Sequence, residues 1–130
     1  MIILDENIPR DQRELLQNWG RRLKQIGYDF GRQGLKDAEE IVPLLHSIRQ
    51  PVLFTRDMGF FKRRFCHRRY GVVCLDIVAE ETARYIRRFL RHAKFNTNAK
   101  RMGKVVRVSP QKIHYWSLKM EKEVEIGWET

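Results

Sequence analysis

Three short apolar runs in this chain are each followed by an aspartate. The runs span residues 2–4, 52–55 and 72–75, and the aspartates are Asp5, Asp57 and Asp76. An uninterrupted apolar run of this length is typical of a strand that is buried on both faces of a parallel sheet. We therefore expect strands at residues 1–5, 52–55 and 71–75.

Apolar residues recur at helical spacing in the segments between these runs. The first set predicts a helix from about residue 10 to residue 26, which Gly27 ends. A second helix is expected over residues 37–48, although Pro43 lies within it. A third is expected from about residue 80 to residue 92.

Shorter elements are expected in three other places. Residues 28–30 predict a short second strand, between a helix end and a glycine-rich loop. Phe60, Phe61 and Phe65 predict a short helix after residue 57, with the phenylalanines facing the core. Residues 103–116 alternate in a strand-like way and predict a terminal hairpin.

The order of these elements favours one fold class. Strands and helices alternate up to residue 92, which implies an α/β fold with three α-β-α layers around a short, mostly parallel central sheet. We expect the strand order 2-1-3-4. The 130 residues suffice for one domain. We place it at residues 1–117, with a basic helix and a hairpin extending it from about residue 79, and an acidic tail at 118–130.

The three aspartates are candidates for one site. Ligands of open α/β sheets bind outside the carboxyl ends of the strands, where Asp5, Asp57 and Asp76 are expected to converge. Two charges about 4 Å apart repel by roughly 4 kcal/mol at an effective dielectric constant of about 20. Such a cluster needs protons or a hard divalent cation, so a cation is the first functional expectation.

The charge of the chain is unevenly distributed. Its formal net charge is +10, and residues 49–112 carry 17 basic side chains against 4 acidic ones. Such a field attracts phosphate polymers or anionic membranes. No apolar run approaches the length of a membrane span, and the 2 cysteines are too few for a disulfide framework. We therefore expect a cytoplasmic protein that does not bind membranes.

Three segments resemble a known family. They are Leu4-Asp5-Glu6-Asn7-Ile8-Pro9 at the start, Asp37-Ala38-Glu39-Glu40-Ile41 before a helix, and Thr55-Arg56-Asp57-Met58-Gly59-Phe60 after a strand. In this order they resemble the PIN-like domain family, in particular its small branch related to toxin ribonucleases and to the Mut7-type carboxy-terminal ribonuclease domain. The resemblance covers roughly residues 1–76. The basic helix that follows and residues 103–109 are similar to segments that some members carry.

The resemblance implies a metal-dependent endoribonuclease that acts on single-stranded or structured RNA with Mg²⁺ or Mn²⁺ as cofactor. It implies that Asp5 and Asp57 are catalytic and hold the metal, that Thr55 supplies a hydroxyl, and that Asp37 or Glu40 supplies an acid from a helix. Asp37 and Asp76 are further candidate metal ligands. The resemblance also suggests a toxin that a separate antitoxin protein holds in check, and it leaves a homodimer open.

Two sets of basic side chains are candidate RNA contacts. The stretch over residues 56–69 interleaves aromatic and basic residues, as grooves for single-stranded nucleic acid do. Four arginines at i, i+3, i+4 and i+7 share one face of the helix expected at residues 80–92. The two sets are Arg56, Lys62, Arg63, Arg64, Arg68 and Arg69, and Arg84, Arg87, Arg88 and Arg91.

The same residues also allow purely structural interpretations. Asp5 and Asp57 suit the capping of loops or helices that follow a strand. Asp37 and Glu40 have the spacing of a capping box. The arginines are equally compatible with a solvated helix face.

Two alternative functions stay open on the sequence. One is a non-catalytic RNA-binding protein on the same fold. The other is a phospho-receiver domain, in which Asp5, Glu6 and Asp57 would form the acidic site. A receiver also needs a hydroxyl residue ending its fourth strand and a lysine ending its fifth, and residues 72–76 offer neither.

The last residues reverse the charge of the body. Residues 121–130 carry four glutamates against one lysine. Such a terminus is most often loose or an edge strand. A sharper hypothesis is that it folds over the basic groove and competes with substrate.

Overall fold

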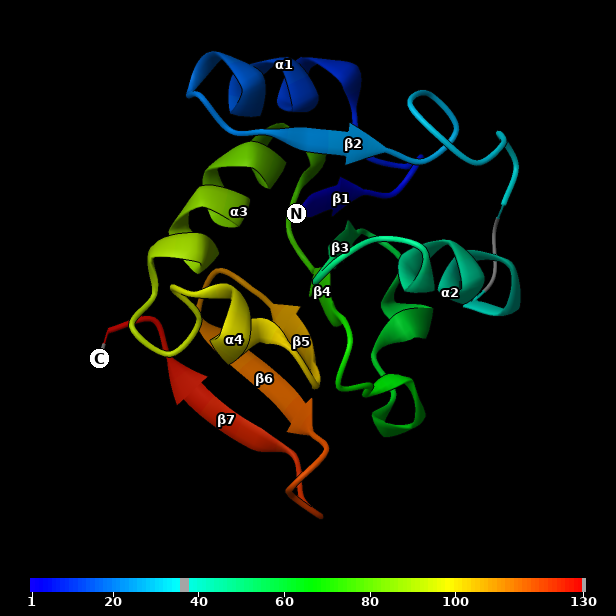
Figure 1. Cartoon of the computed structure of the whole chain (residues 1–130). Helices are drawn as coiled ribbons and strands as arrows, with labels where there is room; N and C mark the ends of the chain where they lie inside the picture. The colour runs from blue at the N-terminus through cyan, green and yellow to red at the C-terminus, as the bar shows by residue number, and fades with distance from the viewer. Residues whose placement is uncertain (36–37, 130) are drawn as a thin grey trace.

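The computed structural model describes residues 1–35 and 38–129, and these form one seven-stranded sheet in the order β2-β1-β3-β4-β5-β6-β7 (Figure 1). Pairing is parallel from β2 through β5 and antiparallel from β5 to β7. The chain is therefore of the α/β class with a mixed sheet, and the expected order 2-1-3-4 is confirmed. The strands are β1 (Ile2–Leu4), β2 (Leu23–Gln25), β3 (Val52–Thr55), β4 (Gly71–Leu75), β5 (Lys104–Val108), β6 (Lys112–Ser117) and β7 (Val124–Gly127).

Helices lie on both faces of this sheet. One face carries α1 and α3, which pack against each other, and the other carries α2 with the short turns η1 and η2 (Figure 1). The helices are α1 (Arg10–Asn18), α2 (Ala38–His46), α3 (Thr82–Arg91) and α4 (Asn98–Arg101), and the 3₁₀ turns are η1 (Met58–Phe60), η2 (Arg63–Phe65) and η3 (Ala79–Glu81).

Alternate side chains of the central strands enter two separate cores. In β1, Leu4 belongs to the core under α1 and α3, whereas Ile3 belongs to the core under α2. In β3, Phe54 and Leu53 divide in the same way. Because both faces of these strands are buried, both faces need apolar side chains, which explains the uninterrupted apolar runs.

The first helix is shorter than expected and the second strand comes earlier. α1 ends at Asn18, and Gly20 follows with φ of +84°, a left-handed conformation that glycine adopts without steric penalty. The chain then reverses, and β2 pairs with β1 at residues 23–25. The prediction of a strand at residues 28–30 was wrong, since only Phe30 forms an isolated bridge there.

Two other helix predictions are corrected in detail. α2 is continuous through Pro43 but ends at His46. The helix expected after residue 57 is replaced by η1 and η2, two separate 3₁₀ turns. Phe60 is buried and Phe65 packs against the same core, so the inward direction of these phenylalanines was correctly predicted.

The C-terminal segments extend the same sheet. β5 pairs in parallel with β4, and β5 and β6 form the expected hairpin. β7 pairs with β6 and is the last strand of the sheet, which agrees with the edge-strand interpretation of the tail. Trp128 follows β7 directly and packs against the core under α1 and α3.

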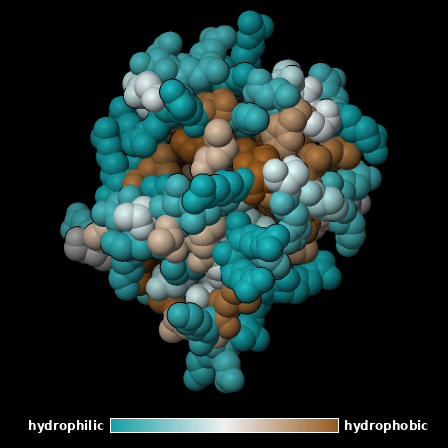
Figure 2. Space-filling view, viewed as in Figure 1, coloured by the Kyte–Doolittle hydropathy of each residue, from teal (hydrophilic) through white to brown (hydrophobic). Residues whose placement is uncertain are grey.

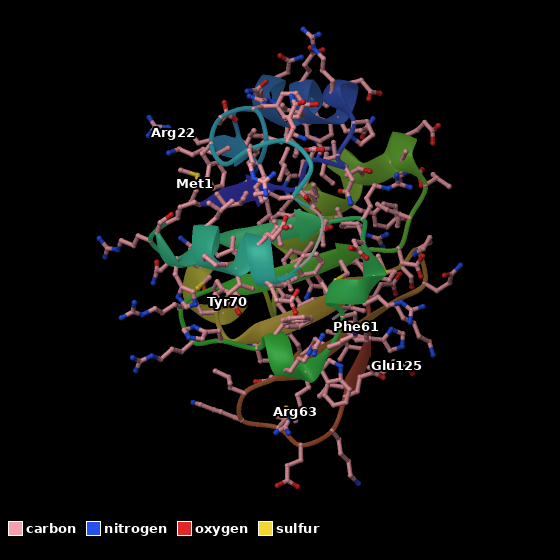
Figure 3. All side chains as sticks on the ribbon, turned by 90° about the vertical axis from the view of Figure 1, so that its right-hand side faces the viewer. Met1, Arg22, Phe61, Arg63, Tyr70 and Glu125 are labelled. Atoms are coloured by element: carbon pink, nitrogen blue, oxygen red, sulfur yellow. The ribbon has the colours of Figure 1, made fainter. Side chains whose placement is uncertain are left out.

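The parallel strands give the sheet a carboxyl edge and an amino edge. Asp5, Asp57 and Asp76 follow β1, β3 and β4 and therefore lie at the carboxyl edge. Met1 and Tyr70 precede β1 and β4, and Figure 3 shows both on the opposite side of the molecule from Phe61.

Hydrophilic side chains cover most of the face seen in Figure 2, with apolar patches between them. Across the described ranges, no helix combines the length and the apolar character that a membrane crossing requires.

Candidate functional site

Asp5 is a buried carboxylate at the carboxyl end of β1, with 5% of its surface exposed. Its Oδ1 accepts the backbone N–H of Glu6 at 2.7 Å, and its Oδ2 accepts the hydroxyl of Thr55 at 2.6 Å. Its own backbone N–H donates to the carbonyl of Phe54 in β3 at 2.9 Å. The Asp5 carboxylate is therefore held at the junction of β1 and β3.

Thr55 connects Asp5 to Asp57. It is fully buried at the end of β3, and its Oγ1 accepts the backbone N–H of Asp57 at 3.0 Å and the side-chain amide of Asn7 at 3.4 Å. A hydroxyl oxygen has two lone pairs and one proton to donate. Since both lone pairs are engaged, the proton is directed at Asp5, and Oδ2 of Asp5 is an acceptor.

Asp57 is the exposed partner of Asp5. Its Oδ1 accepts the backbone N–H of Gly59 at 2.8 Å and so caps η1. Among the residues that the structure describes, none donates a hydrogen bond to its Oδ2. The capping interpretation therefore accounts for one oxygen of Asp57 and leaves the other toward solvent.

Asp5 and Asp57 line one hollow of about 350 Å³. Glu6, Asn7 and Leu35 complete its lining. The structure thus brings together the two aspartates that follow β1 and β3, although 52 positions separate them in the sequence.

The surroundings of Asp5 disfavour its charge. Burial raises the pKa of Asp5 above its ordinary value, and the negative charges of Asp57 and Glu6 raise it further. Hydrogen bonds from Thr55 and from the backbone of Glu6 act in the opposite direction but do not cancel the effect of burial. A cation beside Asp5 and Asp57 would offset both the lost hydration and the repulsion.

The negative charge of Asp57 also reaches the next strand. Burial raises the pKa of the Cys74 thiol in β4 to about 12, and Asp57 adds to this shift, whereas Arg107 opposes it. A thiol of this kind stays protonated at neutral pH and packs as a small apolar group. Cys74 is therefore part of the core behind the site rather than a reactive group within it.

A second hollow shares Asp57 with the first. It measures about 170 Å³, and its charged lining consists of Asp57, Glu39, Lys62 and Arg64. Asp57 comes from the end of β3, Glu39 from the first turn of α2, and the two basic side chains from the segment around η2. The acidic edge of the sheet therefore opens directly onto basic side chains.

The donor set of the first hollow fits a hard cation with few protein ligands. Mg²⁺ is usually bound through one or two carboxylates and keeps several waters. Asp5 and Asp57 are two such acids in this hollow, and Glu6, which lines it with them, accepts the backbone N–H of Gly34 at 2.9 Å. Over residues 1–35 and 38–129, no group of three or more histidine, cysteine, aspartate or glutamate side chains is arranged to hold a metal ion.

Asp76 does not join the other two aspartates. It lies at the same edge of the sheet, but its Oδ2 pairs with Arg107 Nη2 of the neighbouring β5 at 3.1 Å, and it lines neither hollow. The three aspartates therefore share the carboxyl edge, as expected, but only Asp5 and Asp57 line the same hollow, and Asp76 has its own partner in Arg107.

Of the two candidate acids of the second helix, Asp37 and Glu40, the structure describes only Glu40. Asp37 lies outside the described residues. Glu40 is on the exposed part of α2, and the side chain that lines a hollow with Asp57 is its neighbour Glu39.

The sheet separates the two sets of basic side chains. Lys62, Arg63 and Arg64 lie on the face that carries α2, and the arginines of α3 lie on the opposite face. Arg68 and Arg69 line a hollow of about 490 Å³ with residues that precede β3 and β5, which places them at the amino edge. The two candidate sets of RNA contacts therefore do not form one surface, and Lys62 and Arg64 are the members that share a hollow with Asp57.

Arg56 lies between Thr55 and Asp57 in the sequence. Its backbone N–H donates to Oδ1 of Asn7 at 3.3 Å, and its buried Nε has no hydrogen-bond partner within the described chain. Arg56 therefore helps to fix Asn7 against Thr55.

Glu39 and Asn7 are site residues that sequence reasoning missed. Glu39 adjoins Glu40, and the helical pattern alone did not show which of the two turns toward β3. Asn7 lies in the segment Leu4-Asp5-Glu6-Asn7-Ile8-Pro9, which carries part of the family resemblance but gave Asn7 no role of its own. Its contact with Thr55 depends on the pairing of β1 with β3.

Comparisons of the chain with models of protein families, with curated proteins and with solved structures found no match.

Proposed function

We propose that this chain is a metal-dependent endoribonuclease of the PIN-like type, built as three α-β-α layers. One observation carries the proposal. The buried Asp5 is joined through Thr55 to Asp57 at the carboxyl edge of parallel strands, and Asp57 also borders the basic side chains of Lys62 and Arg64.

Asp5 and Asp57 would hold Mg²⁺ or Mn²⁺ through their carboxylate oxygens. A divalent ion bound there makes a coordinated water a better nucleophile toward a phosphodiester. Asp5 contributes a carboxylate fixed by two hydrogen bonds, so little order has to be gained when a cation binds. Asp57 contributes the exposed carboxylate, which an RNA strand would reach from solvent.

Lys62 and Arg64 would position the RNA backbone. They line the hollow that Asp57 shares, so a phosphate seated there lies next to the acidic edge. Arginine and lysine contacts of this kind position a nucleic acid without reading its sequence. We therefore propose an enzyme with weak sequence preference, and the toxin and antitoxin roles follow only if a protein partner inhibits it.

Cleavage of a labelled RNA by the purified chain in Mg²⁺ or Mn²⁺ tests this proposal. Asp57→Asn removes a charge from an exposed side chain and should abolish cleavage while the circular dichroism spectrum stays the same. Asp11→Asn is the matched control, because Asp11 is exposed on α1 and lines neither hollow. Equal turnover by Asp57→Asn and the control would reject the assignment.

A non-catalytic RNA-binding protein on the same fold is the second candidate. It is favoured by the absence, over residues 1–35 and 38–129, of a group of three or more acidic, histidine or cysteine side chains arranged to hold a metal ion. It predicts RNA binding that does not depend on Mg²⁺ and leaves the RNA intact.

A phospho-receiver is less well supported, because Asp76 follows β4 and Ser109 follows β5, where a hydroxyl and a lysine are needed. Failure to form an acyl phosphate with a small phosphodonor would exclude it.

A further inference from the structure

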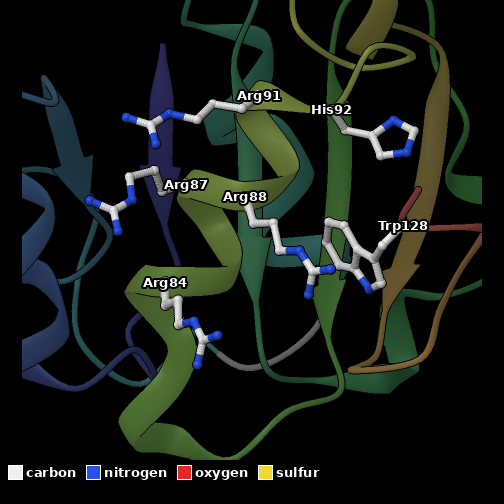
Figure 4. Close-up of a pocket in the computed structure, with 6 residues that line it drawn as sticks. All are labelled: Arg84, Arg87, Arg88, Arg91, His92 and Trp128. Atoms are coloured by element: carbon white, nitrogen blue, oxygen red, sulfur yellow. The ribbon is translucent and has the colours of Figure 1, made fainter. Parts of the chain in front are cut away.

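The four arginines of α3 line a hollow that includes none of the three aspartates, and they need their own explanation. They line a hollow of about 350 Å³ together with His92 and Trp128, on the face of the sheet opposite to η1 and η2 (Figure 4). The lining residues are Arg84, Arg87, Arg88, Arg91, His92 and Trp128. We name this hollow the α3 hollow.

Few negative charges neutralise the α3 hollow. Arg84 pairs with Glu81 one turn earlier at 3.1 Å, and both side chains are largely exposed. Within the described ranges, no ion pair or hydrogen bond is formed by the side chains of Arg87, Arg88 and Arg91. Three guanidinium groups therefore remain available for an anion from outside.

Two of these arginines are held flat against indole rings. The guanidinium carbon of Arg87 lies 3.7 Å from the centre of the Trp19 ring, and that of Arg88 lies 4.4 Å from the centre of the Trp128 ring. Figure 4 shows Arg88 directed at Trp128. Stacking leaves the N–H groups at the edge of each guanidinium free to donate, so the side chains are oriented before any ligand binds.

The C-terminal segment builds this hollow and does not fill it. Trp128 follows β7, and its Nε1 donates to the carbonyl of Ser109 at 2.7 Å, which fixes the ring beside Arg88. Glu125 of β7 pairs with Lys112 and His114 on β6 and not with α3. Within the described part of the tail, Trp128 therefore supplies a wall of the hollow, and Glu125 pairs elsewhere.

We propose that the α3 hollow is a second nucleic-acid site, which binds the backbone of single-stranded RNA without a metal ion. The arginines at positions 84 and 91 are seven residues apart on a helix, or about 10 Å, so the row is long enough to contact more than one phosphate of an extended strand. The guanidinium group of Arg88 and the indole ring of Trp128 also offer planar faces on which unpaired bases can stack. An acidic protein would match the charge but would not need these planar faces.

Binding of a fluorescein-labelled single-stranded RNA in EDTA, measured over a range of salt concentrations, tests this site. Arg88→Gln combined with Arg91→Gln removes two exposed charges that have no ion-pair partner within the described chain. The association constant K falls as salt rises, so the slope of log K against log salt is negative. In the variant this slope should be smaller in magnitude by about 1.4, because each lost phosphate contact on a single strand contributes about 0.7. The affinity should fall roughly tenfold at about 0.1 M salt.

Lys119→Gln combined with Lys122→Gln is the matched control, since it removes two exposed charges from the turn between β6 and β7. The control should bind as the unmodified chain does. An unchanged slope in the arginine variant, or the same loss in the control, would overturn the proposal. Equally tight binding of polyglutamate would also overturn it, in favour of an acidic protein partner.

A tryptophan signal gives an independent readout. RNA should quench the fluorescence of the unmodified chain more than that of Trp128→Phe, because Trp128 lines the hollow. Equal quenching in both would count against the site. The test needs neither a metal ion nor cleavage, so this proposal and the nuclease proposal can fail separately.

Discussion

Thr55 and Asp5 are fifty positions apart in the sequence, yet the hydroxyl of Thr55 donates to Oδ2 of Asp5 at 2.6 Å in the buried seam between β1 and β3. The polarity of this bond is set by Thr55, whose oxygen already accepts from Asp57 and Asn7. The bond orients the carboxylate that the proposed metal site depends on.

Thr55→Val tests the structural value of this bond. Valine keeps the shape but removes the hydroxyl, which leaves Oδ2 of Asp5 and the backbone N–H of Asp57 without this partner. An unsatisfied buried polar group costs about 1–3 kcal/mol, so the free energy of unfolding should fall by that amount in urea titrations. Thr55→Ser keeps the hydroxyl and should retain most of the stability. Equal midpoints for the valine variant and the unmodified chain would contradict the assigned bond.

The raised pKa of Asp5 predicts how stability changes with pH in the absence of metal. The folded chain binds this proton more tightly than the unfolded chain does. The contribution of Asp5 to the free energy of unfolding therefore falls as pH rises from the ordinary carboxyl range through the raised pKa. Urea titrations in EDTA from acidic to neutral pH should show the unmodified chain losing stability relative to Asp5→Asn. A gain of stability by the unmodified chain relative to Asp5→Asn as pH rises would mean that the pKa is lowered instead.

Mg²⁺ should stabilise the folded chain if Asp5 and Asp57 bind it. At a concentration about ten times the Kd, the free energy of unfolding should rise by about 1.4 kcal/mol, and Tm should rise with it in thermal scans. Asp57→Asn should lose most of this increase, and Asp76→Asn should keep it, because Asp76 pairs with Arg107. An increase of the same size in both variants would place the metal elsewhere.

Gly71 at the start of β4 has no room for a side chain. A Cβ atom there would lie 2.5 Å from the carbonyl oxygen of Arg101, a backbone atom that cannot rotate away. Gly71→Ala should therefore lower the free energy of unfolding by about 1–3 kcal/mol. Gly127→Ala is the control, because the nearest atom to its Cβ would be 3.9 Å away. Equal urea midpoints for both alanine variants would show that the β4 backbone shifts without cost.

The central strands were predictable because burial on both faces demands continuous apolar sequence. β1, β3 and β4 were found in this way, and with them the placement of Asp5, Thr55 and Asp57 at one edge. β2 was misplaced because it has three residues and a lysine at its centre. Leu23 also fitted the helical spacing of the preceding helix, and pairing with β1 is a tertiary effect that local spacing does not report.

The distribution of the basic residues was not predictable from their order. Arg64 and Arg88 belong to segments that are both basic and aromatic, yet they lie on opposite faces of the sheet. The side on which a segment packs depends on the handedness of the connections and not on its composition. The partner of Asp76 was missed for a related reason, since Arg107 comes from a strand whose parallel pairing with β4 was not foreseen.

β7 forms one end of the sheet, so half of its backbone groups face away from β6 and meet no other strand in the described chain. Exposed edges of this kind can recruit a strand from another molecule. Here Glu123, directly before β7, is exposed at that border and has no ion-pair partner within the described chain. Two copies aligned antiparallel at this border would oppose their glutamates, which gives the molecule a built-in resistance to growing into an extended fibre.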